Sequence, residues 1–191
     1  MNIIGWNGSP RTDGSTAWAV GKILEGATEQ GAATELFHAG PLGVKPCIGC
    51  LCCVENGDHC VIEDDMQTIY DALKTADTLV LGAPIYMGQM SAQAKAFMDR
   101  LFAQITPHFS PRFKEENAGK KLVLVFTQGN PDAGKFQTYI DYTTKMFNML
   151  EFVVMDTIVI AGTRTAPASE QADLSGKLSC VGKALCAGDA V

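Results

Sequence analysis

The chain has 191 residues, of which 47% are hydrophobic and 19% are charged, so we expect a packed core rather than a disordered chain. The formal net charge is −6 and no basic block is present, which argues against a nucleic-acid partner because phosphate-backbone binding requires clustered Lys and Arg. No apolar run is long enough to span a bilayer, and the N-terminus lacks the regions of a signal peptide, so we expect a cytoplasmic protein without a membrane partner.

Strand-like and helix-like patterns alternate along the chain. Short apolar runs predict strands at residues 2–7, 33–38, 78–82, 121–127 and 153–161. Apolar residues at helical spacing predict helices over residues 16–27, 66–73, 94–105, 136–150 and 174–185. The residues expected to cap the first three helices are Ser15, Asp64 together with Gln67, and Ser91.

This alternation predicts an α/β fold with a parallel sheet covered by helices on both faces. Five strand–helix units favour the flavodoxin-like, doubly wound order 2-1-3-4-5, whose ligand crevice lies between strands 1 and 3 at their carboxyl ends. Residues 1–191 are expected to form a single domain with a cysteine-rich loop at about 40–62. We expect that loop, which follows the second strand, to lie on the ligand side of the sheet.

The loop after the first strand, Gly8-Ser9-Pro10-Arg11-Thr12-Asp13-Gly14-Ser15-Thr16, has the features of a phosphate site. A strand turns there into a helix start, where free N–H groups meet the positive end of the helix dipole. The Gly-Lys-Ser/Thr and Gly-x-Gly-x-x-Gly patterns are absent, so a terminal monophosphate fits better than a triphosphate or pyrophosphate. The alternative is a plain Ser/Gly turn with a surface arginine. The side chains predicted to hold the phosphate are Ser9, Arg11, Ser15 and Thr16.

The loop after the third strand, residues 83–91, can accept a flat ring. An isoalloxazine needs apolar contact on its faces and backbone donors at its edge, and this loop offers both. The alternative is an apolar strand end with a buried tyrosine. Residues 127–129, after the fourth strand, could reach the ring from the other side. The residues predicted to contact the ring of a bound FMN are Pro84, Ile85, Tyr86, Met87, Gly88 and Thr127.

Five of the seven cysteines fall between positions 47 and 60. This clustering indicates metal or redox chemistry in a reducing compartment rather than a disulfide framework. Three cysteines at three-residue spacing could wrap one face of a [4Fe-4S] cluster, and a fourth nearby completes the iron ligands. The alternatives are structural zinc and a redox pair of Cys50 and Cys53. The predicted iron ligands are Cys47, Cys50, Cys53 and Cys60; Cys52 is left over, and Cys180 and Cys186 are expected to be ordinary core or surface residues.

The phrases NGSPRTDGST, CIGCLCCVENGDHCVIEDDM and APIYMGQMSAQAKAFMDRLF resemble the iron–sulfur flavoproteins of the NADPH-dependent FMN reductase superfamily. The resemblance covers most of the chain but is poor at 107–117 and after residue 162. It implies FMN, one [4Fe-4S] cluster on the compact cysteine motif, and a homodimer or a dimer of dimers. It also implies electron transfer through the cluster to the flavin. Cys52 departs from the family's pattern and leaves open whether Cys52 or Cys53 binds iron.

The leading hypothesis is therefore an FMN-dependent electron-transfer oxidoreductase in which a cluster passes single electrons to or from the flavin. No side chain need act as a general base, so no catalytic side chain is predicted. Expected redox partners are ferredoxin, NAD(P)H, a quinone or a small oxidant. The alternatives are a cluster-free NAD(P)H-dependent FMN or quinone reductase, and a non-enzymatic module that is stabilised by zinc or senses redox state through its thiols.

Overall fold

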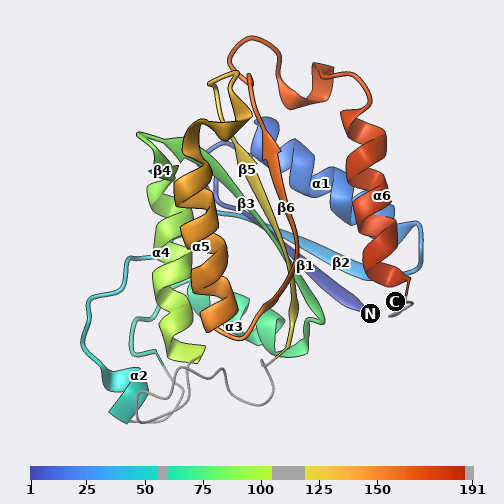
Figure 1. Cartoon of the computed structure of the whole chain (residues 1–191). Coiled ribbons are helices and arrows are strands. Elements are labelled where there is room, and N and C mark those ends of the chain that lie inside the picture. The colour runs from blue at the N-terminus through green and yellow to red at the C-terminus, as the bar shows by residue number, and fades with distance from the viewer. Residues whose placement is uncertain (56–59, 105–118, 188–191) are drawn as a thin grey trace.

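A computed structural model describes residues 1–55, 60–104 and 119–187 of the chain. Its sheet contains five parallel strands in the order β2-β1-β3-β5-β6 (Figure 1), which confirms the predicted order 2-1-3-4-5 once the strands are numbered among the parallel ones alone. The strands are β1 (Asn2–Asn7), β2 (Ala33–His38), β3 (Thr78–Tyr86), β5 (Lys121–Thr127) and β6 (Val153–Ile160). A two-residue strand, β4 (Gln89–Met90), pairs antiparallel with the end of β3.

Helices cover both faces of the sheet (Figure 1). On one face, α1 (Ser15–Thr28) and α6 (Leu174–Cys186) pack on alternate strand residues such as Ile3, Val80 and Val123. On the other face, α3 (Met66–Thr75), α4 (Ala92–Arg100) and α5 (Gln137–Met149) pack on the neighbouring residues, including Leu79 and Leu124. The short helices are α2 (Cys52–Glu55), η1 (Leu101–Gln104), η2 (Ala133–Phe136) and η3 (Ala168–Glu170).

Two glycines allow α1 and α6 to approach each other closely. A Cβ atom at Gly182 would lie 1.9 Å from the Ile23 carbonyl oxygen, and one at Gly26 would lie 2.2 Å from the Ser179 carbonyl oxygen. Both distances are far shorter than any real Cβ contact, so the backbones meet where no side chain fits. The C-terminal helix is thereby fixed against the helix that follows the first strand.

Several element ends differ from the expectations. β3 continues to Tyr86, four residues past its predicted end, because the chain stays extended until Met87 and Gly88 turn it back with φ angles of +50° and +86°. Ser15 is the first residue of α1 rather than its cap, since Gly14 holds the N-cap position. The helix expected over 94–105 ends at Arg100 and continues as the 3₁₀ turn η1; its last residue lies outside the described part of the chain.

The expected capping box at Asp64 and Gln67 does not form. Asp65 holds the N-cap position of α3, and the Gln67 amide donates to the carbonyl oxygens of Cys60 and Ile62 instead. The prediction at Ser91 is confirmed, because its hydroxyl accepts the Ala94 N–H.

Among the described residues, none of the helices combines the length and apolar character needed to cross a lipid bilayer.

Candidate functional site

The loop after β1 passes through a narrow gap between β3 and α4. The Gly8 N–H donates to the Gly82 carbonyl oxygen at 2.8 Å, and the Ser91 hydroxyl donates to the Gly8 carbonyl oxygen. A Cβ atom at Gly8 would lie 2.6 Å from the Ala94 Cβ atom, so only glycine fits. These contacts hold residues 7–16 against residues 83–91, and a contact between the Thr16 and Thr127 hydroxyls brings residues 127–129 alongside. We call these three segments the carboxyl-end corner.

Asn7 shapes the loop, although its role was not predicted from the sequence. Its side chain is fully buried, donates to the Arg11 carbonyl oxygen at 2.9 Å and accepts the Ser9 N–H at 3.2 Å. The Ser9 hydroxyl in turn accepts the Arg11 N–H at 3.1 Å, which leaves the hydroxyl proton free to be donated. An asparagine at a strand end carries no sequence signal for such a role, because its partners are set by the turn itself.

The start of α1 is arranged to bind an anion. Gly14 cannot cap the helix, and no side chain among the described residues replaces it, so the first-turn N–H groups and the helix dipole are available to a ligand. The Arg11 guanidinium lies over Gly14, where a Cβ atom would be 3.2 Å from its Nε and Nη2 atoms. A cavity of about 200 Å³ opens beside this helix start, and Arg11, Asp13, Gly14, Ser15, Trp18, Thr163, Pro167 and Ser169 line it.

The predicted phosphate side chains are thus brought to one turn, but with different surroundings. Ser9 is buried, Arg11 is exposed, and the Ser15 hydroxyl accepts the Ala168 N–H at 3.1 Å. The buried Thr16 hydroxyl lies 2.7 Å from that of Thr127, which fixes the end of β5 against α1. The cavity is smaller than the roughly 300–1,000 Å³ of pockets that enclose a whole ligand, so this turn would hold one end of a larger molecule.

Gln128, directly after β5, carries a buried acceptor without a partner. Its side-chain nitrogen donates to the carbonyl oxygens of Asn130 and Asp132 at 3.2 Å and 2.6 Å. Its Oε1 atom has no hydrogen-bond partner among the described residues, and the residue is 2% exposed. Because an orphaned buried acceptor costs free energy, this oxygen atom calls for a donor that the described residues do not supply.

The residues predicted to contact a ring divide between the core and the surface. Pro84 and Ile85 are buried in β3, whereas Tyr86 is 45% exposed and Met87 is fully exposed at the hairpin tip. The Met90 N–H donates to the Tyr139 hydroxyl at 3.1 Å, which ties the hairpin to α5. Within the carboxyl-end corner, residues 83–91 therefore combine an exposed hydrophobic side chain, Met87, with the buried strand residues Pro84 and Ile85.

The four predicted iron ligands line one pocket, which we call the thiol pocket. It has a volume of about 300 Å³, and its lining consists of Cys47, Ile48, Gly49, Cys50, Leu51, Cys53, Cys60, Val61, Ile62, Asp99 and Phe102. Cys52 is absent from this lining, although it neighbours Cys53. Within the described part of the chain, no three Cys, His, Asp or Glu side chains are grouped closely enough to hold a metal ion.

The thiols of the pocket have different electrostatic surroundings. Cys60 is buried, whereas Cys47 and Cys50 are exposed. Burial, and then the neighbouring Cys60, raise the pKa of the Cys53 thiol. The backbone N–H of Cys52 lowers the pKa of the Cys50 thiol, and the Gly49 N–H donates to the Cys47 Sγ atom at 3.4 Å. A backbone N–H group therefore already points at the exposed Cys47 sulfur.

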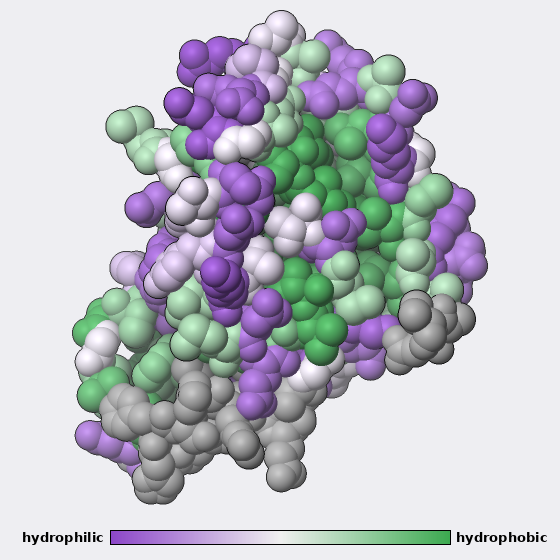
Figure 2. Space-filling view, viewed as in Figure 1, coloured by the Kyte–Doolittle hydropathy of each residue, from purple (hydrophilic) through white to green (hydrophobic). Residues whose placement is uncertain are grey.

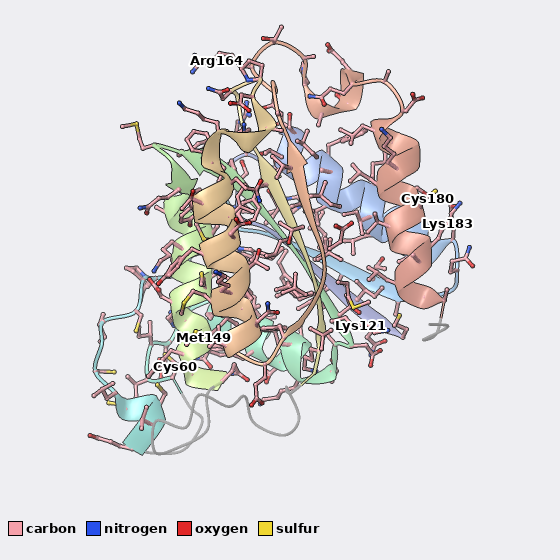
Figure 3. All side chains as sticks on the ribbon, in the orientation of Figure 1. Cys60, Lys121, Met149, Arg164, Cys180 and Lys183 are labelled. Carbon is pink, nitrogen blue, oxygen red and sulfur yellow. The ribbon has the colours of Figure 1, made fainter. Side chains whose placement is uncertain are left out.

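The expected position of the cysteine loop on the ligand side of the sheet is wrong. The loop leaves β2 at the carboxyl ends of the strands, but its thiols share a pocket with Asp99 and Phe102 at the C-terminal end of α4. Figure 1 shows α2 of this loop near the same end of α4. Figure 3 shows Cys60 at the opposite end of the molecule from Arg164, which packs on Gly129 of the carboxyl-end corner. Ser91 and Arg100 are separated by the length of α4, about 14 Å at the usual helical rise.

The sequence and fold of this chain are similar to those of known proteins. A family model described as NADPH-dependent FMN reductase matches residues 1–166. The chain is 43% identical over 100 residues to an iron-sulfur flavoprotein of Methanocaldococcus jannaschii, a match that covers 52% of this chain and 51% of the relative. It is 41% identical over 100 residues to an iron-sulfur flavoprotein of Methanosarcina thermophila, which covers 52% of each protein. The matches thus span about half the length of these curated relatives.

A solved structure with the same fold is an NAD(P)H:quinone oxidoreductase from Methanothermobacter marburgensis. It superposes with a TM-score of 0.71 over 97% of this chain and 98% of that one, at 15% sequence identity. At that identity the likeness establishes the fold alone.

Proposed function

The chain belongs to the NADPH-dependent FMN reductase family, and on that premise we propose that it is an FMN-dependent electron-transfer oxidoreductase whose cysteine loop holds a [4Fe-4S] cluster. A bound flavin supplies a carrier of one or two electrons, and a cluster supplies single-electron transfer. Iron-sulfur flavoproteins among the relatives support both halves of the proposal.

The observation that carries the flavin half is the uncapped start of α1 beneath Arg11. The first-turn N–H groups, the Arg11 guanidinium and the free Ser9 proton would hold the ribityl phosphate, and Ser15 and Thr16 complete the turn. The orphaned Gln128 Oε1 atom suits the ring, because an isoalloxazine carries a ring N–H that needs an acceptor. The 83–91 hairpin would supply the apolar contact.

Substitution of Arg11 tests this assignment. We expect Arg11→Glu to weaken FMN binding by about 10- to 100-fold, since a charge-assisted hydrogen bond to phosphate is lost and a like charge is added. Lys145→Glu, an equal change of charge at an exposed position on α5, is the control and should leave affinity unchanged. Flavin fluorescence titration measures both. Equal affinity of Arg11→Glu and the parent would refute the phosphate site.

The four thiols of the thiol pocket support the cluster half. Cys47, Cys50, Cys53 and Cys60 border one cavity, in keeping with a four-thiolate ligand set, whereas Cys52 lies outside it. After anaerobic purification and reconstitution we expect iron and acid-labile sulfide together with FMN. Cys53→Ser should lose iron and Cys52→Ser should keep it, with flavin bound in both. Flavin without iron or sulfide in the reconstituted parent would defeat the cluster.

A cluster-free NAD(P)H-dependent FMN or quinone reductase is the second candidate. The observation that favours it is that the described thiols are not grouped closely enough to hold a metal ion. It predicts rapid turnover with NAD(P)H and a quinone in Cys50→Ser. Loss of that activity with flavin still bound would count against it.

The partners follow from the same proposal. The electron donor would be NAD(P)H or a ferredoxin, the acceptor a quinone or a small oxidant, and the assembly a homodimer or a dimer of dimers. Light scattering coupled to gel filtration gives the assembly directly. Stopped-flow reduction with NADH, NADPH and reduced ferredoxin separates the donors.

A further inference from the structure

A buried ion pair lies directly beside the thiol pocket. Arg100, the last residue of α4, and Asp64, just before α3, have side chains that are 1% and 2% exposed. Their contact is bidentate, with Nη1–Oδ2 at 2.7 Å and Nη2–Oδ1 at 3.1 Å. Burying two charges is costly unless every polar atom is well paired, so a pair kept in this position calls for a reason beyond stability.

The remaining hydrogen bonds of the pair go to the two ends of the cysteine loop. Arg100 Nη1 donates to the Lys45 carbonyl oxygen at 2.9 Å, and Nη2 donates to the Ile62 carbonyl oxygen at 3.4 Å. Asp64 Oδ2 accepts the Lys45 N–H at 2.8 Å. Lys45 lies two residues before Cys47, and Ile62 lies two residues after Cys60. One ion pair therefore fixes the chain just before the first thiol and just after the last.

Neighbouring side chains strengthen both attachments. Asp65 accepts the Gly43 N–H at 2.7 Å on the first side, and Gln67 donates to the carbonyl oxygens of Cys60 and Ile62 at 3.1 Å and 2.8 Å on the second. The Tyr70 hydroxyl donates to the Arg100 carbonyl oxygen at 2.7 Å, which holds the end of α4 in place. All of these partners come from α3 or from the residues that precede it.

The chemistry requires a guanidinium in this position. A planar fork can serve a carboxylate with two nitrogens and still donate to two carbonyl oxygens, whereas a lysine ammonium is a point charge that cannot meet all four acceptors.

We propose that Arg100 and Asp64 are positioning residues that hold the two ends of the cysteine loop at a fixed separation and thereby set the spacing of the four thiols for the cluster. The inference rests on the proposed cluster, but the contacts that carry it belong to the protein alone. Cys60 lies at the same end of α4 (Figure 3).

Cofactor content tests the proposal. Asp64→Asn and Arg100→Lys keep the size of each side chain but lose part of the hydrogen-bond set. We expect the ratio of iron to FMN after anaerobic reconstitution to fall on the order of tenfold, since loss of groups that orient metal ligands costs about 10- to 100-fold in metal affinity. FMN content should stay at the parental level, because the flavin site lies at the other end of α4. Lys74→Met, at an exposed position on α3 outside the lining of the thiol pocket, is the control and should keep both cofactors.

An unchanged ratio of iron to FMN in both variants would overturn the proposal. Loss of iron and FMN together would also overturn it, because the pair would then serve only global stability. If Asp64→Asn fails to fold, Gln67→Ala removes only the bonds to Cys60 and Ile62 and should lower iron content while flavin remains.

Amide hydrogen exchange of the metal-free protein keeps this test separate from that of the cluster. The Lys45 amide should exchange about tenfold or more faster in Asp64→Asn than in the parent, since its acceptor is weakened. The Gly8 amide, bonded to Gly82, should be unchanged. A parent that takes up no iron refutes the proposed cluster, whereas equal Lys45 exchange in the parent and Asp64→Asn refutes the positioning pair whether or not iron binds.

Discussion

Asp64 is a single carboxylate on which several segments converge. It accepts the N–H groups of Lys45 and Met66 and both terminal nitrogens of Arg100. Burial by itself raises the pKa of Asp64, but these hydrogen bonds outweigh burial and bring the pKa below its usual value. Its contribution to folding is therefore present above the pKa of the unfolded chain and is lost as pH falls through the lower pKa of the folded state.

We predict an acid-dependent difference between the parent and Asp64→Asn. At pH 7 the variant should have a free energy of unfolding about 3–5 kcal/mol lower, because a buried guanidinium is left without its charge partner. Below about pH 4 the difference should shrink, since the parental carboxylate then becomes protonated. Urea unfolding of the metal-free proteins between pH 7 and pH 3 measures this. A difference that is constant with pH would contradict the assigned ionisation.

Ser91 links the start of α4 to the loop after β1. Ser91→Ala removes the cap at Ala94 and the bond to the Gly8 carbonyl oxygen, so we expect the free energy of unfolding to fall by about 1–2 kcal/mol. FMN affinity should fall as well, because the loop loses a support. Ser175→Ala, at an exposed position on α6, is the control and should stay within about 0.5 kcal/mol of the parent. Chemical unfolding and fluorescence titration give the two quantities.

Ser91 and Asp64 show which contacts could be predicted from the sequence and which could not. Ser91 was predicted as a cap because its partner is three residues away and the pattern is local. Asp64 and Gln67 showed the same local pattern, yet their side chains bond to segments up to 36 residues away. A single sequence does not reveal such long-range partners. Asn7, Gln128 and Arg100 were missed for the same reason.

At the scale of elements, α1 and α6 depend on close backbone contact. Gly182→Ala would place a Cβ atom 1.9 Å from the Ile23 carbonyl oxygen, so the two helices must separate. We expect a loss of about 1–3 kcal/mol in the free energy of unfolding, the usual cost of overpacking. Gly176→Ala in the same helix meets no atom within 4 Å and should be neutral or stabilising by up to about 1 kcal/mol. Equal stability of the two variants would contradict the packing described.

Element prediction succeeded where the periodicity was strong. The strand order followed from the alternation together with the count of five strand–helix units, because parallel strands joined by helices leave few arrangements. Element ends were less accurate: β3 runs on until a turn with two positive φ angles, and α4 changes to a 3₁₀ turn at Leu101. The position of the thiols was also missed, because a long loop can return along a helix without any signal in its composition.

At the scale of the whole molecule, β6 forms one edge of the sheet and leaves apolar side chains exposed. Val153 is 47% exposed and Met155 is 48% exposed, and Figure 2 shows hydrophobic side chains gathered over β6 between α5 and α6. The ladder with β5 shifts register here, so that Val154 and Asp156 pair with consecutive residues and Met155 bulges between them. A bulge and an exposed charge are common means of keeping an edge strand from pairing with another molecule.

Asp156 is the exposed charge on β6, and removing it should therefore increase self-association. We predict that Asp156→Val raises the apparent molecular mass in light scattering as concentration increases, beyond whatever assembly the parent forms. Asp141→Val removes a carboxylate that is also exposed, from α5, and should behave as the parent does. Identical profiles for both variants would mean that the bulge alone protects the edge.

The placement of two sites at the two ends of α4 constrains how this protein can vary. Each residue inserted into a helix lengthens it by about 1.5 Å and rotates everything beyond the insertion by about 100°. A single inserted residue would therefore swing Arg100 away from Asp64 while Ser91 stayed in place. A tolerated change in the spacing between the carboxyl-end corner and the thiol pocket has to come in whole helical turns, or else through compensating changes in the loops. The length of α4 therefore sets the distance between the corner and the pocket.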